Sequence, residues 1–271
     1  MIELPADLRY YFGENDAFEA ILNVKGKVFR EHKNRKTVHI RKDGKGYFLK
    51  VHRAVGWREI FKNLFSLRLP VLGAQNEIRA IKRLEEIGVE TMKMVGYGFR
   101  GMPPAWMESF LITEELEGTV SLEEFSREWK SNPPDFTLKL AIIKKVAEIA
   151  RLLHKNGINH RDFYICHFLI DLKSLEEMSN EGLRMYLIDL HRVQLQEKVP
   201  QRWIIKDLAG LCFSSMDIGL NRRDILRFMK FYSGKPLRTS FREDSRFWEL
   251  VKRRAVKLYE REFKRLPGLQ I

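Results

Sequence analysis

The first 117 residues alternate short apolar runs with turn-forming residues, a pattern typical of a small antiparallel sheet. Polar segments at 32–36 and 42–44 separate the first three runs, and a Gly/Pro loop at 101–104 separates the last two. The predicted strands cover residues 28–31, 37–41, 46–51, 92–99 and 109–116.

Between the third and fourth predicted strands, the apolar residues follow helical spacing instead. Residues 57–65 carry apolar side chains at intervals of three and four, with Arg58, Lys62 and Arg68 interleaved or just beyond. This predicts a basic amphipathic helix that either packs on the sheet or contacts anionic lipid. A second helix is predicted at 74–86, where Gly88 ends it.

From residue 118 onward the pattern is mainly helical. The clearest helix runs over 137–154, and Asn156-Gly157 ends it. Ser121 is expected to cap a short acidic helix at 122–129. The other predicted elements are strands at 167–171 and 185–190, a helix that opens at 206–208, and helices within 221–231 and 243–264.

The composition indicates a core-forming protein with an anionic partner. The 271 residues are 44% hydrophobic and 31% charged, with a formal net charge of +13. This charge favours a nucleotide, a phosphorylated sugar, acidic lipid, nucleic acid or an acidic protein as partner. Only two cysteines, Cys166 and Cys212, are present, which fits a reducing compartment. Neither a signal peptide nor an apolar run of ~18 residues is found, so we expect a cytoplasmic protein.

The candidate chemistry begins directly after the long helix, at His160-Arg161-Asp162. In phosphoryl-transfer enzymes, a loop of this type carries a carboxylate that orients the incoming hydroxyl, and the residue five positions later holds a metal. That later position is His167. Asp189, which ends the strand predicted at 185–190, is suited to Mg²⁺ because hard cations prefer oxygen ligands. Arg161 is expected to be a structural arginine paired beside Asp162.

The remaining parts of such a site occur in the order that two-lobed kinases use. Lys50, late in the third strand, would contact the α/β-phosphates, and Glu77 in the following helix would pair with it. Backbone groups from Glu114 to Leu116 would bind an adenine edge. This order predicts an α+β, protein-kinase-like fold. Its N-lobe, residues 1–117, would hold the antiparallel sheet, and its C-lobe, residues 118–271, would be mainly helical.

Asp207 has two interpretations from the sequence. It would hydrogen-bond the backbone of the catalytic loop, or it would be only an acidic residue near the start of a helix. The basic tail from Arg222 to Arg265 likewise has two interpretations, a solvated face or an anionic docking surface. The pattern of residues does not decide either case.

Several long segments resemble the bacterial lipopolysaccharide core heptose(I) kinases, and they extend from about residue 16 to residue 231. The 3-deoxy-D-manno-octulosonic acid (Kdo) kinases share the His-Arg-Asp region with this chain but less of the remainder. The resembling segments include HRDFYICHFL (160–169), LIDLHR (187–192), VPQRW (199–203), KDLAGL (206–211), FSSMDIGL (213–220), NPPD (132–135) and SLRLPVLGA (66–74).

The resemblance implies ATP-dependent phosphorylation of the first heptose of the inner core, on nascent lipopolysaccharide at the cytoplasmic face of the inner membrane. It places Asp162 at the catalytic position and Lys50 at the phosphate-contacting position. The basic surface would attract the acidic lipopolysaccharide, and an acidic protein such as acyl carrier protein would fit the same surface.

Two features depart from ordinary protein kinases. The chain has no Gly-x-Gly-x-x-Gly loop, so Lys33, Arg35 and Lys36 in the first hairpin turn would cover the phosphates by charge instead. Protein kinases carry Asn where this chain has His167, although the resembling family also has His. His167 would ligate the metal, or hydrogen-bond Asp162 or a phosphate.

Three alternatives remain beside the heptose kinase. The first is a Kdo kinase of the same superfamily. The second is a catalytically inactive kinase-like scaffold, suggested by the missing glycines and by His167. The third is a basic nucleic-acid-binding protein, which rests on net charge alone because the sequence contains no nucleic-acid motif.

Overall fold

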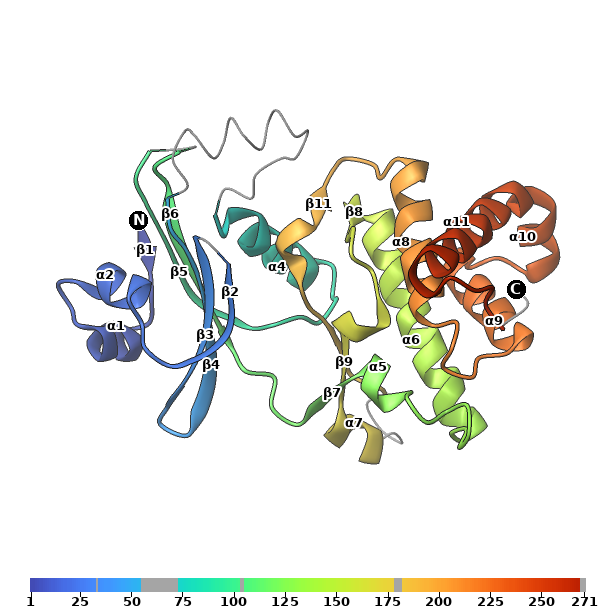
Figure 1. Ribbon diagram of the computed structural model, residues 1–271, viewed down its shortest axis with the longest axis horizontal. Coiled ribbons are helices and arrows are strands. Elements are labelled where there is room, and N and C mark those ends of the chain that lie inside the picture. Colours follow the sequence, from blue (N-terminus) through green and yellow to red (C-terminus); the bar gives the residue numbers. More distant parts are fainter. Residues whose placement is uncertain (33, 55–72, 103–104, 178–181, 269–271) are drawn as a thin grey trace. The chain divides into compact units, whose positions relative to one another are not determined.

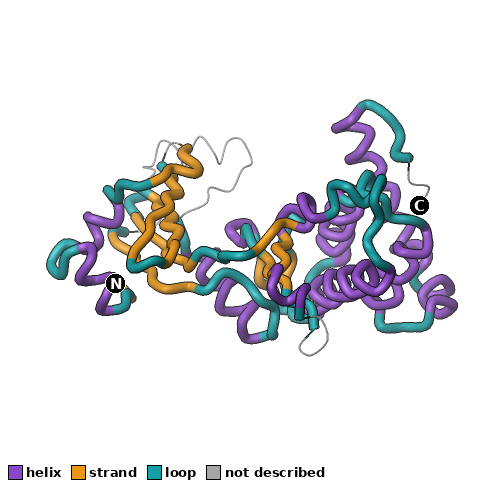
Figure 2. Tube along the Cα trace, turned by 90° about the horizontal axis from the view of Figure 1, so that it is seen from below, coloured by secondary structure: helices purple, strands orange, loops and turns teal. Residues whose placement is uncertain are grey.

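The computed structural model describes residues 1–32, 34–54, 73–102, 105–177 and 182–268, and the chain forms two compact units (Figure 1). The first unit comprises Met1–Arg83 and Met92–Glu117, and the second comprises Leu84–Thr91 and Gly118–Ile271. Residues 84–91, which we expected in the first lobe, are therefore grouped with the second unit. Strands dominate the first unit and helices the second (Figure 2).

The first unit is built on a six-stranded antiparallel sheet in the order β1-β5-β6-β4-β3-β2. The five predicted strands are all present. A sixth strand, β1, was not predicted because it is only two residues long. The strands are β1 (Ile2–Glu3), β2 (Lys27–His32), β3 (Arg35–Lys42), β4 (Lys45–His52), β5 (Met94–Arg100) and β6 (Glu108–Glu114).

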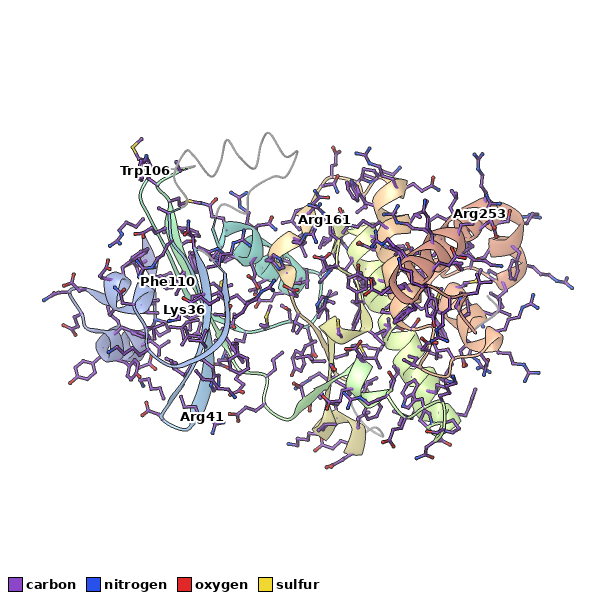
Figure 3. The ribbon with its side chains drawn as sticks, viewed as in Figure 1. Lys36, Arg41, Trp106, Phe110, Arg161 and Arg253 are labelled. Atoms are coloured by element: carbon purple, nitrogen blue, oxygen red, sulfur yellow. The ribbon has the colours of Figure 1, made fainter. Side chains whose placement is uncertain are left out.

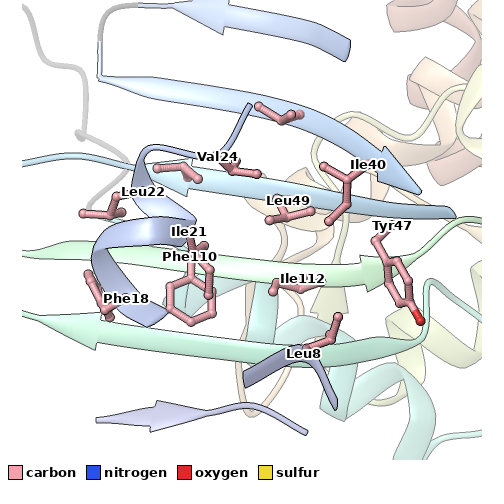
Figure 4. Close-up of a cluster of buried hydrophobic side chains, with 12 residues drawn as sticks. Leu8, Phe18, Ile21, Leu22, Val24, Ile40, Tyr47, Leu49, Phe110 and Ile112 are labelled. Carbon is pink, nitrogen blue, oxygen red and sulfur yellow. The ribbon is translucent and has the colours of Figure 1, made fainter. Parts of the chain in front are cut away.

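Two short helices that the sequence pattern did not reveal cover one face of this sheet, α1 (Ala6–Phe12) and α2 (Ala17–Leu22). Their apolar side chains pack with inward residues of the strands into one buried cluster (Figure 4). The rings of Phe18 and Phe110 meet edge-on at 5.3 Å. A Cβ on Gly98 would lie 2.5 Å from the Phe110 ring, so this position requires glycine.

The opposite face of the sheet carries Lys50. Tyr47, Leu49 and Val51 belong to the buried cluster, and side chains alternate along a strand, so Lys50 points away from that cluster. Helix α4 (Gln75–Glu86) supplies the residue that meets Lys50. The predicted helix at 74–86 is thus confirmed, whereas the basic helix predicted at 57–65 lies outside the described residues.

The second unit is organised around α6 (Phe136–Lys155), the long helix predicted from its apolar spacing. Asp135 caps its first turn by accepting a hydrogen bond from the Thr137 N–H at 2.7 Å. The other helices are α5 (Leu122–Phe125), α7 (Leu172–Glu176), α8 (Gln201–Ser214), α9 (Arg222–Ser233), α10 (Leu237–Glu243) and α11 (Ser245–Phe263), with 3-10 turns η1 (Ile165–His167) and η2 (Leu190–Arg192).

Two small sheets accompany these helices. Strands β7 (Thr119–Ser121), β9 (Phe168–Asp171) and β10 (Met185–Leu187) form one, and β8 (Ile158–Asn159) and β11 (Gln194–Leu195) form the other. Both sheets are antiparallel. The strands predicted at 167–171 and 185–190 correspond to β9 and β10.

Three predicted boundaries in the second unit are wrong. Helix α8 begins at Gln201 after Pro200 rather than at residues 206–208. Helix α5 ends at Phe125, although Ser121 caps it as expected through the Glu124 N–H. Strand β10 ends at Leu187, so Asp189 lies beyond the strand.

An apolar cavity of about 390 Å³ lies inside the second unit. Helices α6, α8, α9 and α11 contribute most of its lining, including Ile143, Val146, Leu211 and Met229. Cys212 also lines it. Among the described helices none combines the length and the apolar character needed to cross a bilayer.

Candidate functional site

Asp207 anchors the loop that holds the His-Arg-Asp sequence. One of its carboxylate oxygens accepts the backbone N–H of His160 at 2.6 Å, and the other accepts that of Arg161 at 2.8 Å. Asp207 is 1% exposed and lies in the middle of α8. The prediction that it hydrogen-bonds the catalytic loop is therefore confirmed, and the alternative of an acid at a helix N-terminus is wrong.

Helix α8 also fixes the rest of this loop. The Ser214 hydroxyl accepts the Ile165 N–H at 3.1 Å. A Cβ on Gly210 would lie only 3.1 Å from the Phe163 carbonyl oxygen, so the helix backbone approaches the loop closely. Helix α8 thus holds the loop around Asp162 through several contacts.

The Asp162 carboxylate is held by Arg192. Nη1 of Arg192 lies 2.8 and 2.9 Å from the two carboxylate oxygens. The prediction that Arg161 is paired beside Asp162 is wrong, because Arg161 instead places its guanidinium 5.5 Å from the centre of the Trp203 ring. Arg161 has a positive φ of 74°, which turns its side chain away from the course of an extended chain. Figure 3 labels Arg161 on this loop.

His167 links Asp162 to Asp189. Its Nδ1 lies 2.7 Å from the backbone carbonyl oxygen of Asp162, and its Nε2 lies 3.4 Å from a carboxylate oxygen of Asp189. Because a carbonyl only accepts hydrogen bonds, Nδ1 carries a proton. Of the three roles expected for His167, the hydrogen bond to Asp162 is thus observed, through the backbone of that residue.

His160 connects the same loop to the segment before Asp189. Its Nε2 lies 3.0 Å from the Ile188 carbonyl oxygen, so Nε2 carries the proton. The ring is fully buried, and this burial lowers the pKa of His160 below its ordinary value. A neutral histidine at this position contributes to the architecture of the loop.

Asp189 has a left-handed backbone, with φ of 62° and ψ of 51°, just before η2. One carboxylate oxygen is bonded to Nδ1 of His191, and the other faces His167. Its donor chemistry fits Mg²⁺, which commonly binds through one or two carboxylates together with substrate phosphates and waters. In the described part of the chain, no three His, Cys, Asp or Glu side chains gather as a metal site. Metal binding at Asp189 stays a prediction.

The first unit brings Lys50 and Glu77 into direct contact, as expected. Lys50 Nζ forms an ion pair with Glu77 Oε1, and Glu77 is only 2% exposed. A buried carboxylate holds its partner strongly, because removal of the partner would leave an unpaired charge. The ion pair fixes the direction of the lysine, while its contact with phosphates stays a prediction.

Glu114 and Arg35, two other residues predicted to contact the nucleotide, lie in strands β6 and β3 of the first unit. The Glu114 N–H donates to the Lys93 carbonyl at 2.9 Å, and its carboxylate pairs with Lys93 at the same distance. Adenine binding near Glu114 and Leu116 therefore stays a prediction. Arg35 lies in β3 rather than in the predicted turn, and burial lowers its pKa. Lys33 lies outside the described residues.

Arg192 and His191 were not predicted as site residues. Both lie within the segment LIDLHR (187–192), one of the segments that resemble the kinase family. Arg192 is 30 positions from Asp162 in sequence, and spacing in a single sequence does not indicate such a contact. The available signal was a pair of polar residues two and three positions after Asp189.

Comparison with known proteins supports the assignment of the fold. Residues 19–232 match the model of the lipopolysaccharide kinase (Kdo/WaaP) family. A solved structure described as "WaaP in complex with acyl carrier protein" is 42% identical and superimposes with a TM-score of 0.81. The match covers 96% of this chain and 100% of that chain.

Curated relatives extend this similarity over nearly the whole chain. The lipopolysaccharide core heptose(I) kinase WaaP of Pseudomonas aeruginosa is 49% identical over 247 residues, 91% of either chain. The protein of the same name from Escherichia coli is 46% identical over 265 residues, which are 98% of this chain and 99% of the relative. The E. coli K12 protein is 46% identical over 261 residues, 96% of this chain and 98% of the relative. The resemblance noted in the sequence is thus confirmed, and this chain belongs to the lipopolysaccharide kinase (Kdo/WaaP) family.

Proposed function

We propose that this protein transfers the γ-phosphoryl group of ATP to a hydroxyl of the first heptose of the lipopolysaccharide inner core. The observation that carries the proposal is the similarity of 46–49% over at least nine-tenths of the chain to relatives named as heptose(I) kinases. The Lys50–Glu77 ion pair in the first unit supports it. So do the contacts of Asp162 with Arg192 and of Asp189 with His167 in the second unit.

Asp162 orients the acceptor. The hydroxyl oxygen attacks the γ-phosphorus, the bond to the β–γ bridging oxygen breaks, and ADP leaves. The hydroxyl proton passes towards the Asp162 carboxylate. Arg192 keeps this carboxylate in one orientation by bonding to both of its oxygens, which positions it before the acceptor arrives.

Lys50 and Asp189 act on the nucleotide in this proposal. Lys50, directed by Glu77, contacts the phosphates. Asp189 holds Mg²⁺, which when bound offsets negative charge on the phosphates. His167 and His191 flank the Asp189 carboxylate and hold its position.

A phosphate-transfer assay tests the proposal. Purified protein with Mg²⁺ and labelled ATP is expected to phosphorylate lipopolysaccharide isolated from cells that lack the core phosphate. Asp162→Asn is expected to reduce turnover by roughly 10²- to 10⁴-fold, because a positioned acid–base group is lost. Asp43→Asn, in an exposed turn of the first unit, is the control and should retain activity.

The same assay separates the alternatives. Phosphorylation of an acceptor that carries octulosonic acid but no heptose would indicate a Kdo kinase instead. Mass spectrometry of the product assigns the phosphate to heptose or to the acidic sugar. Lack of turnover with either acceptor, together with no Mg²⁺-dependent nucleotide binding, would support the inactive scaffold.

We further propose that the protein acts at the cytoplasmic face of the inner membrane and binds acyl carrier protein. The net charge of +13 favours both an acidic lipid surface and an acidic protein. A relative was solved with acyl carrier protein, and the cavity of about 390 Å³ in this chain has the apolar lining that a carried acyl chain would need. Size-exclusion chromatography with holo and acylated carrier protein would test this, with tighter binding of the acylated form expected.

A further inference from the structure

Three cationic side chains surround one aromatic ring beside the catalytic loop. The guanidinium carbons of Arg161 and Arg202 lie 5.5 and 5.4 Å from the centre of the Trp203 ring, and Lys206 Nζ lies 5.5 Å from it. Positive charges gathered around one ring repel one another, and Lys206 experiences this repulsion from Arg161. The negative face of the indole offsets only part of that repulsion.

The carboxylates nearest to these cations are already engaged. Both oxygens of Asp207 accept backbone N–H groups, and both oxygens of Asp162 accept from Nη1 of Arg192. Within the described ranges of the chain, neither Arg161 nor Lys206 forms an ion pair with a carboxylate. Nε of Arg161 is buried and has no hydrogen-bond partner there.

The electrostatics of Lys206 agree with this excess of positive charge. Burial is the largest cause that lowers the pKa of Lys206, followed by repulsion from Arg161 and Arg192. Both arginines therefore lie within electrostatic range of the Lys206 ammonium. A bound anion would relieve the repulsion among all three.

Arg192 has further N–H donors that can bind an anion. Only Nη1 contacts Asp162, and the described residues offer no acceptor to Nε and Nη2. These two nitrogens form the edge of a guanidinium that binds carboxylate or phosphate oxygens in pairs. The Arg192 side chain is 41% exposed, so a substrate can reach it.

We propose that Arg161, Arg192 and Lys206 form a subsite for an oxyanionic group, a carboxylate or phosphate, that the glycolipid acceptor carries close to the accepting hydroxyl. The proposal rests on the proposed function, because the acceptor hydroxyl is placed at Asp162. Arg192 bonds to Asp162, and Lys206 lies within electrostatic range of both, so an anion bound by these cations would lie beside the reacting hydroxyl. The subsite would select acidic acceptors over neutral ones.

Steady-state kinetics of Lys206→Met test the subsite. The KM for the acceptor is expected to rise roughly 10- to 100-fold, as for a lost hydrogen bond to a charged group, with the KM for ATP within about twofold of native. Lys206→Arg is expected to restore most of the affinity because it keeps the charge. Lys173→Met removes an exposed lysine of α7, and should leave both constants unchanged. Equal thermal unfolding of the variants checks that the fold is retained.

Modified acceptors identify the group that is bound. Reduction of sugar carboxylates to alcohols and enzymatic dephosphorylation are compared separately, in native protein and in Lys206→Met. The modification that removes the true ligand should weaken native binding but have little further effect in the variant. Native turnover of the unmodified acceptor establishes the proposed function independently of this result.

Two outcomes would overturn the subsite while leaving the kinase function intact. A rise in the KM for ATP alone would mean that the cations bind a nucleotide phosphate. Acceptor affinities that are the same for Lys206→Met and native protein would mean that the cations have no ligand on the acceptor. Absence of turnover by native protein would instead contradict the proposed function itself.

Discussion

Asp207 illustrates what a single buried carboxylate does for the site. It satisfies two backbone N–H groups in the loop that carries Asp162, and it does so from a helix 46 or 47 positions away in sequence. The sequence indicated Asp207 as a candidate, but the choice between its two predicted roles depended on where α8 begins. Pro200 was the missed signal, because proline is favoured at the start of helices and the apolar spacing becomes clear only later.

Asp207→Asn is expected to destabilise the protein by about 2–4 kcal/mol. The amide oxygen can accept one backbone N–H, but the NH₂ group would face the other backbone N–H. That N–H would lose its bond to a charged acceptor and remain a buried donor without a partner. Chemical denaturation followed by fluorescence measures the change. Asp217→Asn, at a partly exposed acid of the same unit, is the control, and an equal loss there would contradict a specific role for Asp207.

The two cysteines give a prediction that depends on pH. Burial raises the pKa of Cys166 to about 11 and that of Cys212 to about 12. Because only the thiolate reacts, alkylation at pH 8 should be roughly 100-fold slower for Cys166 and roughly 1000-fold slower for Cys212 than for a free thiol. Each increase of one pH unit should speed both reactions about tenfold. Mass spectrometry after timed iodoacetamide treatment measures this, and rapid alkylation at pH 8 would contradict it.

At the scale of elements, strand β4 and helix α4 together present the lysine and its partner. Alternation along β4 directs Lys50 to the face opposite the buried cluster, and Glu77 lies in the first turn of α4. Both positions were predicted because strand and helix periods are strong signals over such lengths. Helices α1, α2 and α10 were missed because each has only six or seven residues.

Glu77→Gln is expected to raise the KM for ATP about tenfold and to lower kcat, because an uncharged amide holds Lys50 less firmly. Steady-state kinetics over a range of ATP concentrations measures both effects. Glu19→Gln is the matched control, since Glu19 pairs with Arg100 at an exposed site of the same unit. If Glu77→Gln had the same kinetic constants as native protein, the ion pair would have no role in the mechanism.

Contacts between loops that are far apart in sequence could not be predicted, and this limited the prediction of the site. Asp162 and His167 were predicted as site residues because the spacing within a kinase-type loop is local, and Asp189 was predicted because it follows an apolar strand. The pairing of Asp162 with Arg192 was missed because it joins two loops through the packing of the second unit. Arg161 was assigned that role from adjacency, but its left-handed backbone sends its side chain to Trp203.

At the scale of the whole molecule, the fold class, the family and the kinase activity inferred from the sequence agree with the comparisons. An α+β architecture with a sheet-rich first unit and a helical second unit was predicted from the order of the periodic segments. The net charge of +13 was informative about partners but carried no information about the fold.

This charge predicts a salt effect on acceptor binding. Raising NaCl from 50 to 300 mM is expected to increase the KM for lipopolysaccharide several-fold, because salt screens attraction between the basic protein and an anionic acceptor. The kcat should change much less, since the groups around Asp162 are partly buried and less screened. Initial rates at saturating ATP measure both, and a salt-independent KM would exclude long-range attraction.

The left-handed backbone of Asp189 has a practical consequence for anyone who prepares an inactive form of this enzyme. Asparagine, aspartate and glycine tolerate this conformation, whereas alanine is strained there by ~1 kcal/mol or more. An alanine replacement would therefore mix loss of the carboxylate with a distorted chain. Asp189→Asn removes the negative charge with the backbone undisturbed, which makes it the cleaner reagent for trapping bound acceptor.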